Sequence, residues 1–265
     1  MTLEARDLSG TWQLDDRDSS RINSCTPGIA QEVIGSNLGY GQLYYALTRL
    51  LRPRTVLVIG SGYGFTPGVI ALALKHDGGR GRVLFVDPGY SNTVQGPERA
   101  HGGSGTWATS RGMSRFDCLG VRSLVTHFRE RNDQFFPRYA SRGLPRPELI
   151  VIDGAHDLGN AQYDTANALK IVKKPGYVLM HDSTNWWSRT GHMGVANVVR
   201  ELSLEHEVLT FPGQAGLSLI RVVKPGRKLD LAVIPPAPVL GLGALLLGAA
   251  FAVGWTVGRS VGLNE

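Results

Sequence analysis

Short apolar runs alternate with segments of helical length across residues 55–223. Strands that alternate with helices favour a parallel sheet covered on both faces. Two further runs, 206–211 and 216–223, are joined by a short turn, so they predict a terminal hairpin that adds one antiparallel strand. The other strand-like runs are 55–59, 83–86, 123–128, 149–152 and 177–180. The pattern therefore predicts a doubly wound α/β domain with a mostly parallel sheet.

The ends of the chain differ in composition from this central region. Residues 1–38 are rich in Asp, Ser and Gly and lack an apolar signal sequence, so we expect an N-terminal arm or cap. The main domain is predicted over 39–223, and it begins with an amphipathic helix at 39–51. Residues 224–238 form a basic, Pro-containing linker, 239–258 form an uncharged run, and 259–265 form a short tail.

The uncharged run 239–258 is long enough to cross a bilayer as a helix. Trp255 near its end suits a membrane interface. Basic residues before the run outnumber the single Arg259 after it, which predicts a single-pass C-terminal anchor with the main domain on the cytoplasmic face. The alternative is a hairpin or dimerisation helix that packs on the soluble domain.

Charge and cysteine content narrow the choice of partners. The chain has 28 Lys and Arg against 22 Asp and Glu, a net charge of +6. These basic residues are scattered and are not interleaved with aromatic residues, so no nucleic-acid partner is predicted. Cys25 and Cys118 lie far apart and form no CxxC motif. The sequence therefore predicts neither a disulfide framework nor a cysteine metal site, and it fits a reducing compartment.

Acidic residues follow two consecutive strand-like runs. Asp153 ends the sequence LIVID, and Asp182 comes just after YVLM, with one helix-length crossover between them. Parallel strands joined in this way often lie side by side, and their carboxyl ends form the crevice where open α/β sheets bind ligands. His156 is close enough to overhang that crevice. An acid pair and a histidine can together bind a cation and deprotonate a hydroxyl.

A glycine-rich turn, IGSGYG, follows the first strand-like run. Glycine permits a sharp turn and a close approach of a ligand to the backbone. The dinucleotide fingerprint requires a glycine where this chain has Phe65, so Gly60, Gly62 and Gly64 fit a nucleoside ligand better than a pyrophosphate. Asp87 ends the next strand, where an acid can accept hydrogen bonds from ribose hydroxyls.

Several other residues have two interpretations. Asp133 either faces an adenine edge or caps the following helix. His127 lies within a strand and is expected to be a hydrogen-bonded core or edge residue. Residues 89–110 are predicted to form a lid with Trp107 as its anchor. A polar loop after Asp182 is interpreted either as a substrate-facing wall or as a patch against a membrane or a partner subunit; its residues are Trp186, Trp187 and His192.

The motifs GSGYG, VDP, IDGAHD, KKPGYVLMHDS and GVANVVREL, taken in this order, resemble those of class I S-adenosylmethionine-dependent methyltransferases. Within that family they are similar to the macrocin, mycinamicin and rhamnosyl O-methyltransferases. The resemblance covers about residues 40–223, and IDGAH followed by PGYVLMHD is its most specific part. It implies a seven-stranded sheet whose last strand is antiparallel.

The resemblance also implies roles for individual residues. Gly60, Ser61, Gly62 and Asp87 would contact S-adenosylmethionine, and Gly64 and Asp133 complete the predicted cofactor site. His156 would be the general base. The magnesium site of the metal-dependent members would use Asp153 and an acid pair at 181 and 182. This chain has His181 in place of the first acid of that pair, which leaves weak Mg²⁺ binding, another divalent metal bound with His181, or no metal. His181 could instead point to the opposite face.

Three functional hypotheses follow. The first is O-methyl transfer to a hydroxyl of a small molecule, with a lipid-like acceptor such as a glycolipid sugar or a polyketide suggested by the predicted anchor. The second is an NAD-dependent Rossmann-type oxidoreductase, against which Phe65 argues. The third is a non-catalytic, membrane-anchored nucleoside-binding scaffold. The sequence leaves open whether the chain forms a homo-oligomer.

Overall fold

The computed structural model describes residues 14–27, 38–96, 103–184, 194–213 and 215–223. The strands of this part are β1 (Thr55–Ile59), β2 (Arg82–Val86), β3 (Val125–Phe128), β4 (Leu149–Ile152), β5 (Gly176–His181), β6 (Glu207–Phe211) and β7 (Leu217–Val222). Its α-helices are α1 (Asp16–Cys25), α2 (Tyr40–Leu51), α3 (Phe65–His76), α4 (Ser114–Leu119), α5 (Asn132–Phe135), α6 (Leu158–Ile171) and α7 (Val195–Leu202). Within these described residues, four short 3₁₀ helices lie at Thr106–Ala108, Ser110–Met113, Arg122–Leu124 and Phe136–Arg138.

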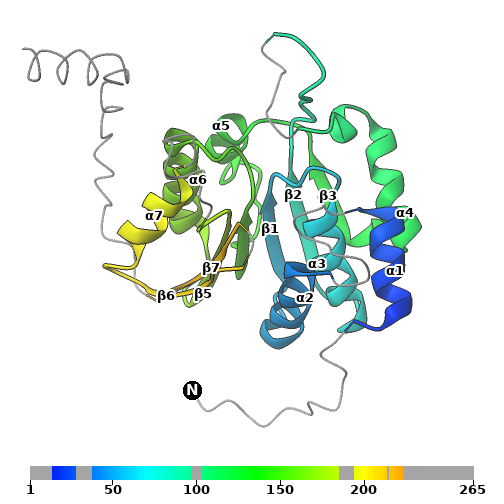
Figure 1. Ribbon diagram of the computed structural model, residues 1–265, viewed down its shortest axis with the longest axis horizontal. Coiled ribbons are helices and arrows are strands. Elements are labelled where there is room, and N and C mark those ends of the chain that lie inside the picture. Colours follow the sequence, from blue (N-terminus) through cyan, green and yellow to red (C-terminus); the bar gives the residue numbers. More distant parts are fainter. Residues whose placement is uncertain (1–13, 28–37, 97–102, 185–193, 214, 224–265) are drawn as a thin grey trace, which may run out of the picture. The chain divides into compact units, whose positions relative to one another are not determined.

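The strands form one seven-stranded sheet in the order β3-β2-β1-β4-β5-β7-β6. The pairs β1·β2, β1·β4, β2·β3 and β4·β5 are parallel, whereas β7 is antiparallel to both β5 and β6. The strand order reverses direction at β1, which is the kind of switch point where open sheets bind ligands. The doubly wound sheet with an antiparallel last strand, predicted from the sequence, is therefore confirmed (Figure 1).

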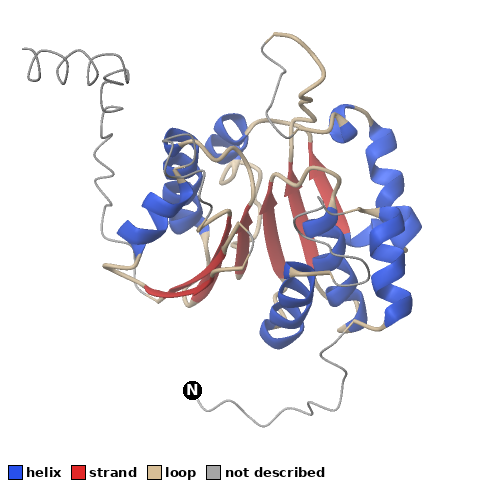
Figure 2. Cartoon of the chain, in the orientation of Figure 1, coloured by secondary structure: helices blue, strands red, loops and turns tan. Residues whose placement is uncertain are grey.

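The central strands β1 and β4 are buried on both faces, which explains why they are almost uniformly apolar. Side chains alternate along each strand. In β1, Val56 and Val58 pack into the cluster formed with α1 to α4, and Leu57 and Ile59 pack into the cluster formed with α5 to α7. Figure 2 shows the resulting three layers, with helices on each side of the strands.

The N-terminal region contains a helix that the sequence did not predict. Asp15 caps α1, and its carboxylate accepts a hydrogen bond from the Asp18 backbone N–H at 2.7 Å. Ile22 is fully buried against the sheet-facing helices. The predicted arm thus includes at least one helix that packs on the main domain.

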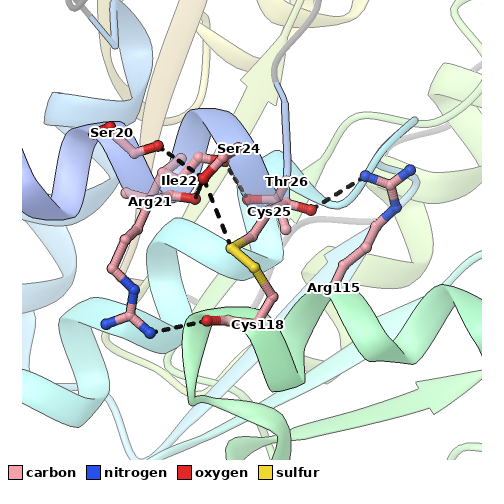
Figure 3. The surroundings of a disulfide bond; sticks show 8 residues. All are labelled: Ser20, Arg21, Ile22, Ser24, Cys25, Thr26, Arg115 and Cys118. Carbon is pink, nitrogen blue, oxygen red and sulfur yellow. Dashed lines mark hydrogen bonds between the residues drawn. A yellow bond between two sulfur atoms is a disulfide. The ribbon is translucent and has the colours of Figure 1, made fainter.

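Cys25 and Cys118 form a disulfide between α1 and α4, with 5.7 Å between their Cα atoms (Figure 3). Two polar contacts flank the bond. An Arg21 guanidinium N–H donates to the Cys118 carbonyl, and Arg115 donates to the Cys25 carbonyl. The prediction of no disulfide was wrong because the pairing depends on how α1 docks, which cysteine spacing does not reveal. Cysteine usage therefore no longer favours a reducing compartment.

We expect loss of this disulfide to lower the free energy of unfolding by about 2–4 kcal/mol, because it closes a long loop in the unfolded chain. The two cysteines are 93 residues apart. Urea titration of the oxidised and reduced protein measures the difference. A Cys25→Ser/Cys118→Ser double variant is the control, since its midpoint should match the reduced protein and should not respond to dithiothreitol. Equal midpoints for oxidised and reduced wild-type protein would show that the bond adds no stability.

None of the helices among the described residues is long and apolar enough to span a bilayer. The predicted transmembrane segment, 239–258, lies outside the described residues, as do the linker and the tail.

Candidate active site

The ends of β4 and β5 bring the predicted acids together. These strands are parallel neighbours with Ile152 paired to Met180, so Asp153 lies level with His181. Odd-numbered residues of both strands, such as Val151 and Leu179, face the cluster that includes α2. Side-chain alternation therefore directs Asp153 and His181 to the same face of the sheet.

Two carboxylates and two imidazoles form one compact group at this edge, called the carboxylate and imidazole group below. Its members are Asp153, His156, His181 and Asp182. His156 Nε2 lies 2.7 Å from Asp182 Oδ2 and 3.9 Å from Asp153 Oδ1. His181 Nδ1 lies 3.2 Å from Asp182 Oδ2 and 3.5 Å from Asp153 Oδ1. The predicted grouping of Asp153, His156 and Asp182 is observed. His181, whose direction the sequence left open, points into the same group.

The backbone at Asp182 is strained. Its φ of 59° lies in the left-handed region, which costs a non-glycine residue roughly 1–2 kcal/mol. The following residues are held by hydrogen bonds from Ser183 N–H to the Gly216 carbonyl and from Thr184 N–H to the Ala215 carbonyl. Strain of this kind persists where the surroundings enforce it, and it is frequent at functional sites. Here the turn leaves the Asp182 carboxylate within ion-pair distance of His156.

The group is electrostatically coupled. Burial by itself lowers the pKa of His156, but the carboxylates of Asp153 and Asp182 outweigh it and raise that pKa to about 10. Burial raises the pKa of Asp182, but contacts with His156 and His181 outweigh it and hold the pKa below its usual range. Without a further positive charge between the carboxylates, His156 is therefore protonated at neutral pH.

Tyr40, which the sequence did not single out, lies beside His181. Its ring meets the His181 ring edge to face, with 5.8 Å between centroids and 89° between planes. Its hydroxyl donates to the carbonyls of Gly213 and, at 3.2 Å, Phe211. The first residue of α2 thus packs against the imidazole and bonds to the turn between β6 and β7. No local sequence pattern announces this contact, because it joins segments more than 100 residues apart.

The glycine turn lies next to the carboxylate and imidazole group. A Cβ on Gly60 would stand 2.3 Å from the Asp153 carbonyl oxygen, so only glycine permits this approach. The space around Gly62 on its Cβ side is open. Asp87 Oδ2 lies 3.4 Å from the Ser61 N–H nitrogen, and Asp87 Oδ1 accepts from Gly89 N–H at 2.7 Å. Burial raises the pKa of Asp87 to about 6.

The loop between β2 and α4 packs onto this turn. Trp107 is buried and stacks on Phe116, and its indole N–H donates to the Gly62 carbonyl at 3.0 Å. The Ser104 hydroxyl donates to the same carbonyl at 2.6 Å. Trp107 therefore anchors the loop, as the sequence predicted. Whether residues 89–110 close over a ligand stays a prediction.

Residues 57–183 match a family model described as a methyltransferase domain. This region includes the glycine turn and the carboxylate and imidazole group. The match covers a little under half of the chain, so this region is similar to methyltransferase domains. No curated protein matches the chain significantly in sequence.

Solved structures of methyltransferases share the fold of this chain. The O-methyltransferase TomG from Streptomyces achromogenes, involved in tomaymycin synthesis and solved with SAM, has 18% identity and a TM-score of 0.58 over 80% of this chain and 92% of its own. An O-methyltransferase from Bacillus cereus in complex with SAH has 14% identity and a TM-score of 0.56 over 78% and 90%. An SAH-bound methyltransferase from Podospora anserina has 14% identity and a TM-score of 0.56 over 84% and 99%.

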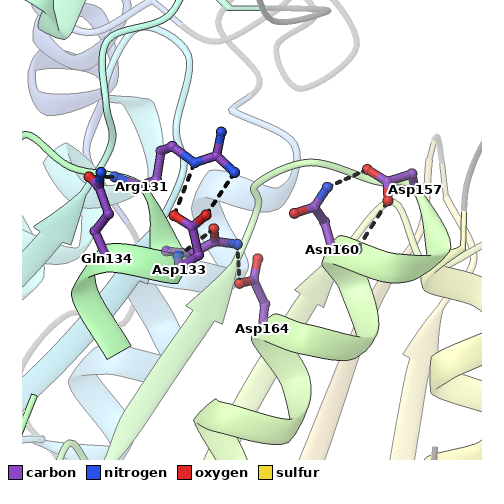
Figure 4. Close-up of polar contacts among 7 residues, drawn as sticks. Arg131, Asp133, Gln134, Asp157, Asn160 and Asp164 are labelled. Atoms are coloured by element: carbon purple, nitrogen blue, oxygen red, sulfur yellow. Dashed lines mark hydrogen bonds and ion pairs between the residues drawn. The ribbon is translucent and has the colours of Figure 1, made fainter. Parts of the chain in front are cut away.

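Asp133 and His127, two other predicted positions, lie in the region that matches the family model. Asp133 lies in the first turn of α5 and forms a two-bond ion pair with Arg131, at 3.0 and 2.8 Å (Figure 4). Arg131 is the residue that precedes the helix, so Asp133 is not its N-cap, and the adenine contact stays a prediction. His127 Nε2 lies 2.9 Å from the Asp87 carbonyl, as expected of a hydrogen-bonded edge residue. Trp186, Trp187 and His192 lie outside the described residues.

A buried carboxylate in α6 lies behind the loop that runs from Asp153 to His156. Asp164 is fully buried and accepts a hydrogen bond from the Asn132 side chain through Oδ1 (Figure 4). Its Oδ2 has no hydrogen-bond partner among the described residues and faces Gly154, 3.4 Å from where a Cβ would stand. Burial raises the pKa of Asp164 to about 7, although the Asn132 contact opposes the shift.

This shift predicts a pH-dependent stability. The folded domain holds the Asp164 proton more tightly than the unfolded chain, in which the pKa is about 3.9. The stabilising contribution is complete below that value and is lost as pH rises through about 7. We expect Asp164→Asn to gain stability relative to wild type as pH rises from about 5 to about 8.5. Urea unfolding at both pH values measures this gain. Asp133→Asn, at an exposed carboxylate, is the control, and an equal response in both variants would contradict the assignment.

Proposed function

We propose that the chain is an S-adenosylmethionine-dependent O-methyltransferase that acts on a hydroxyl of a small molecule. The observation that carries the proposal is the contact between Gly60 and Asp153, which joins the open glycine turn to the carboxylate and imidazole group. S-adenosylmethionine held at the turn would place its sulfonium methyl group beside His156 and His181. The bound SAM and SAH of the structural neighbours support the choice of cofactor.

The proposed cofactor site follows the carboxyl ends of β1, β2 and β3. Asp87 would accept hydrogen bonds from the ribose hydroxyls, as a partly buried acid at the end of β2 can do. The glycine turn would lie against the methionine part, because the Cβ side of Gly62 is open. The full set of proposed cofactor contacts is Gly60, Ser61, Gly62, Gly64, Asp87 and Asp133.

His156 is the proposed general base. The acceptor oxygen would attack the sulfonium methyl in line, so that an O–CH₃ bond forms as the S–CH₃ bond breaks. The hydroxyl proton would pass to the imidazole of His156, and the products would be the methyl ether and S-adenosylhomocysteine. Holding donor and acceptor in this alignment can supply much of the rate enhancement.

The metal-ligand atoms beside His156 suit a divalent cation, but how well they suit it depends on whether the metal accepts a nitrogen ligand. Asp153, His181 and Asp182 each offer one ligand atom, and these atoms lie within 4.8 Å of one another. The imidazole is a poor match for Mg²⁺, which prefers oxygen ligands. A bound divalent cation would neutralise the carboxylates, lower the pKa of an acceptor hydroxyl and leave His156 able to accept its proton.

The acceptor is proposed only as a class. The TomG enzyme takes part in tomaymycin synthesis, which supports a small-molecule acceptor here. An acceptor that is a glycolipid sugar or a polyketide remains a prediction, as does kinship with the macrolide-sugar and rhamnosyl enzymes. The same holds for a membrane anchor at 239–258, a position on the cytoplasmic face and a homo-oligomeric state.

Calorimetric titration tests the choice of cofactor. We expect S-adenosylhomocysteine to bind the full-length chain and NAD to give no heat of binding. The match to a methyltransferase domain already argues against the NAD-dependent alternative. A chain that bound NAD and failed to bind S-adenosylhomocysteine would overturn the proposal.

A further inference from the structure

The carboxylate and imidazole group has a donor set that differs from a magnesium site. Asp153, His181 and Asp182 combine two oxygen ligands with one nitrogen ligand. His181 and Asp182 are buried, and Asp153 is half-buried. These donors are therefore not an acidic surface cluster, in which the charges are solvated and hold no ion.

The position of His181 is fixed from two sides. The Tyr40 ring packs edge-on against its imidazole. On the other side, its Nδ1 atom lies between Asp153 Oδ1 at 3.5 Å and Asp182 Oδ2 at 3.2 Å. The imidazole thus presents a nitrogen to the point where both carboxylates converge, which is the arrangement of a ligand rather than of a side chain that only fills space.

Metal preference follows from donor type. Mg²⁺ demands octahedral oxygen coordination and loses its water reluctantly, whereas imidazole nitrogen suits Zn²⁺, Fe²⁺, Co²⁺ and Ni²⁺. We propose that Asp153, His181 and Asp182 bind a first-row transition metal ion in preference to Mg²⁺. The inference rests on the proposed function in one respect, namely that the ion would lie beside the acceptor hydroxyl. It goes beyond that function by naming the class of metal and the residue that selects it.

Direct metal binding tests the inference. Tag-free, full-length protein is stripped with EDTA, dialysed and titrated with CoCl₂, MnCl₂ and MgCl₂ by calorimetry, and the ligand-field absorption of bound Co²⁺ is recorded as a second measurement. We expect Co²⁺ to bind roughly 100-fold more tightly than Mg²⁺, in line with the affinity order of nitrogen-containing sites. Equal affinities for the two ions, or no metal binding by the folded wild-type protein, would overturn the inference.

Two variants isolate the residue responsible. His181→Asp replaces the nitrogen ligand by oxygen, so we expect the ratio of Co²⁺ to Mg²⁺ affinity to fall by about tenfold or more. His206→Gln changes a histidine outside the group and should leave the ratio unchanged. A ratio unaffected by His181→Asp would contradict the assignment. If that variant does not fold, His181→Asn replaces it, and the wild-type comparison still decides the metal class.

Failure of this inference can be separated from failure of the proposed function. Methyl transfer that depends on His156, in a chain that binds Mg²⁺ as tightly as Co²⁺, would support the proposed function and overturn the metal preference. Selective Co²⁺ binding by a chain that transfers no methyl group would support the metal site and overturn the proposed function.

Discussion

Replacement of His156 by Ala is expected to lower kcat for methyl transfer by about 10²–10⁴-fold, the usual contribution of a general base. His156 Nε2 lies 2.7 Å from Asp182 Oδ2, and the His156 side chain is partly exposed. The substitution removes the proton acceptor and leaves the glycine turn and Asp87 intact. The affinity for S-adenosylhomocysteine should therefore change by less than about threefold.

Steady-state assays and calorimetry measure the two effects separately. His206→Gln is the control, because His206 lies in the turn after α7 and outside the carboxylate and imidazole group. A His156→Ala variant that kept more than about a tenth of the wild-type kcat would not be consistent with a general base worth 10²-fold or more. A variant that lost cofactor binding would show instead that His156 supports the fold of the site.

Replacement of Asp87 by Ala is expected to weaken S-adenosylhomocysteine binding by about 100-fold or more. Each hydrogen bond from a ribose hydroxyl to a carboxylate contributes about 1.5–3 kcal/mol, and the proposed site makes two. The same loss frees the Gly89 N–H, which now donates to Asp87 Oδ1 at 2.7 Å. Calorimetry with S-adenosylhomocysteine measures the change in affinity.

The pH dependence of binding gives an independent measure of the same role. Burial raises the pKa of Asp87 to about 6, so the carboxylate is charged above that pH and protonated below it. Because the charged form accepts both hydroxyls, affinity should fall as pH drops from about 7.5 to about 5. Asp87→Asn cannot titrate and is the matched control, since its affinity should be lower and nearly independent of pH. A wild-type affinity that does not vary over this range would contradict the ribose contact.

Much of the sheet and the centre of the site could be predicted because they depend on local pattern. Strands buried on both faces are apolar throughout, and the residue after each strand falls at the carboxyl edge of the sheet. This rule located Asp87, Asp153 and Asp182 without any knowledge of packing. It also placed β4 beside β5, since one crossover joins them.

The features that were missed depend on contacts between distant segments. The disulfide requires α1 to dock on α4, across 93 residues. The Tyr40–His181 contact joins the start of α2 to the end of β5. The direction of His181 depends on the register of β5 against β4, and a shift of one residue would have turned it to the other face. None of these is encoded in a sequence window.

The account depends most on methyl transfer to an oxygen beside His156. The most direct measurement is mass spectrometry of lipid and polar extracts incubated with the full-length chain and S-adenosylmethionine that carries a deuterated methyl group. We predict a product with the labelled methyl group on oxygen, formed by wild type and nearly absent with His156→Ala. A label found on nitrogen or carbon, equal labelling by the variant, or no labelled product in any fraction would contradict the account.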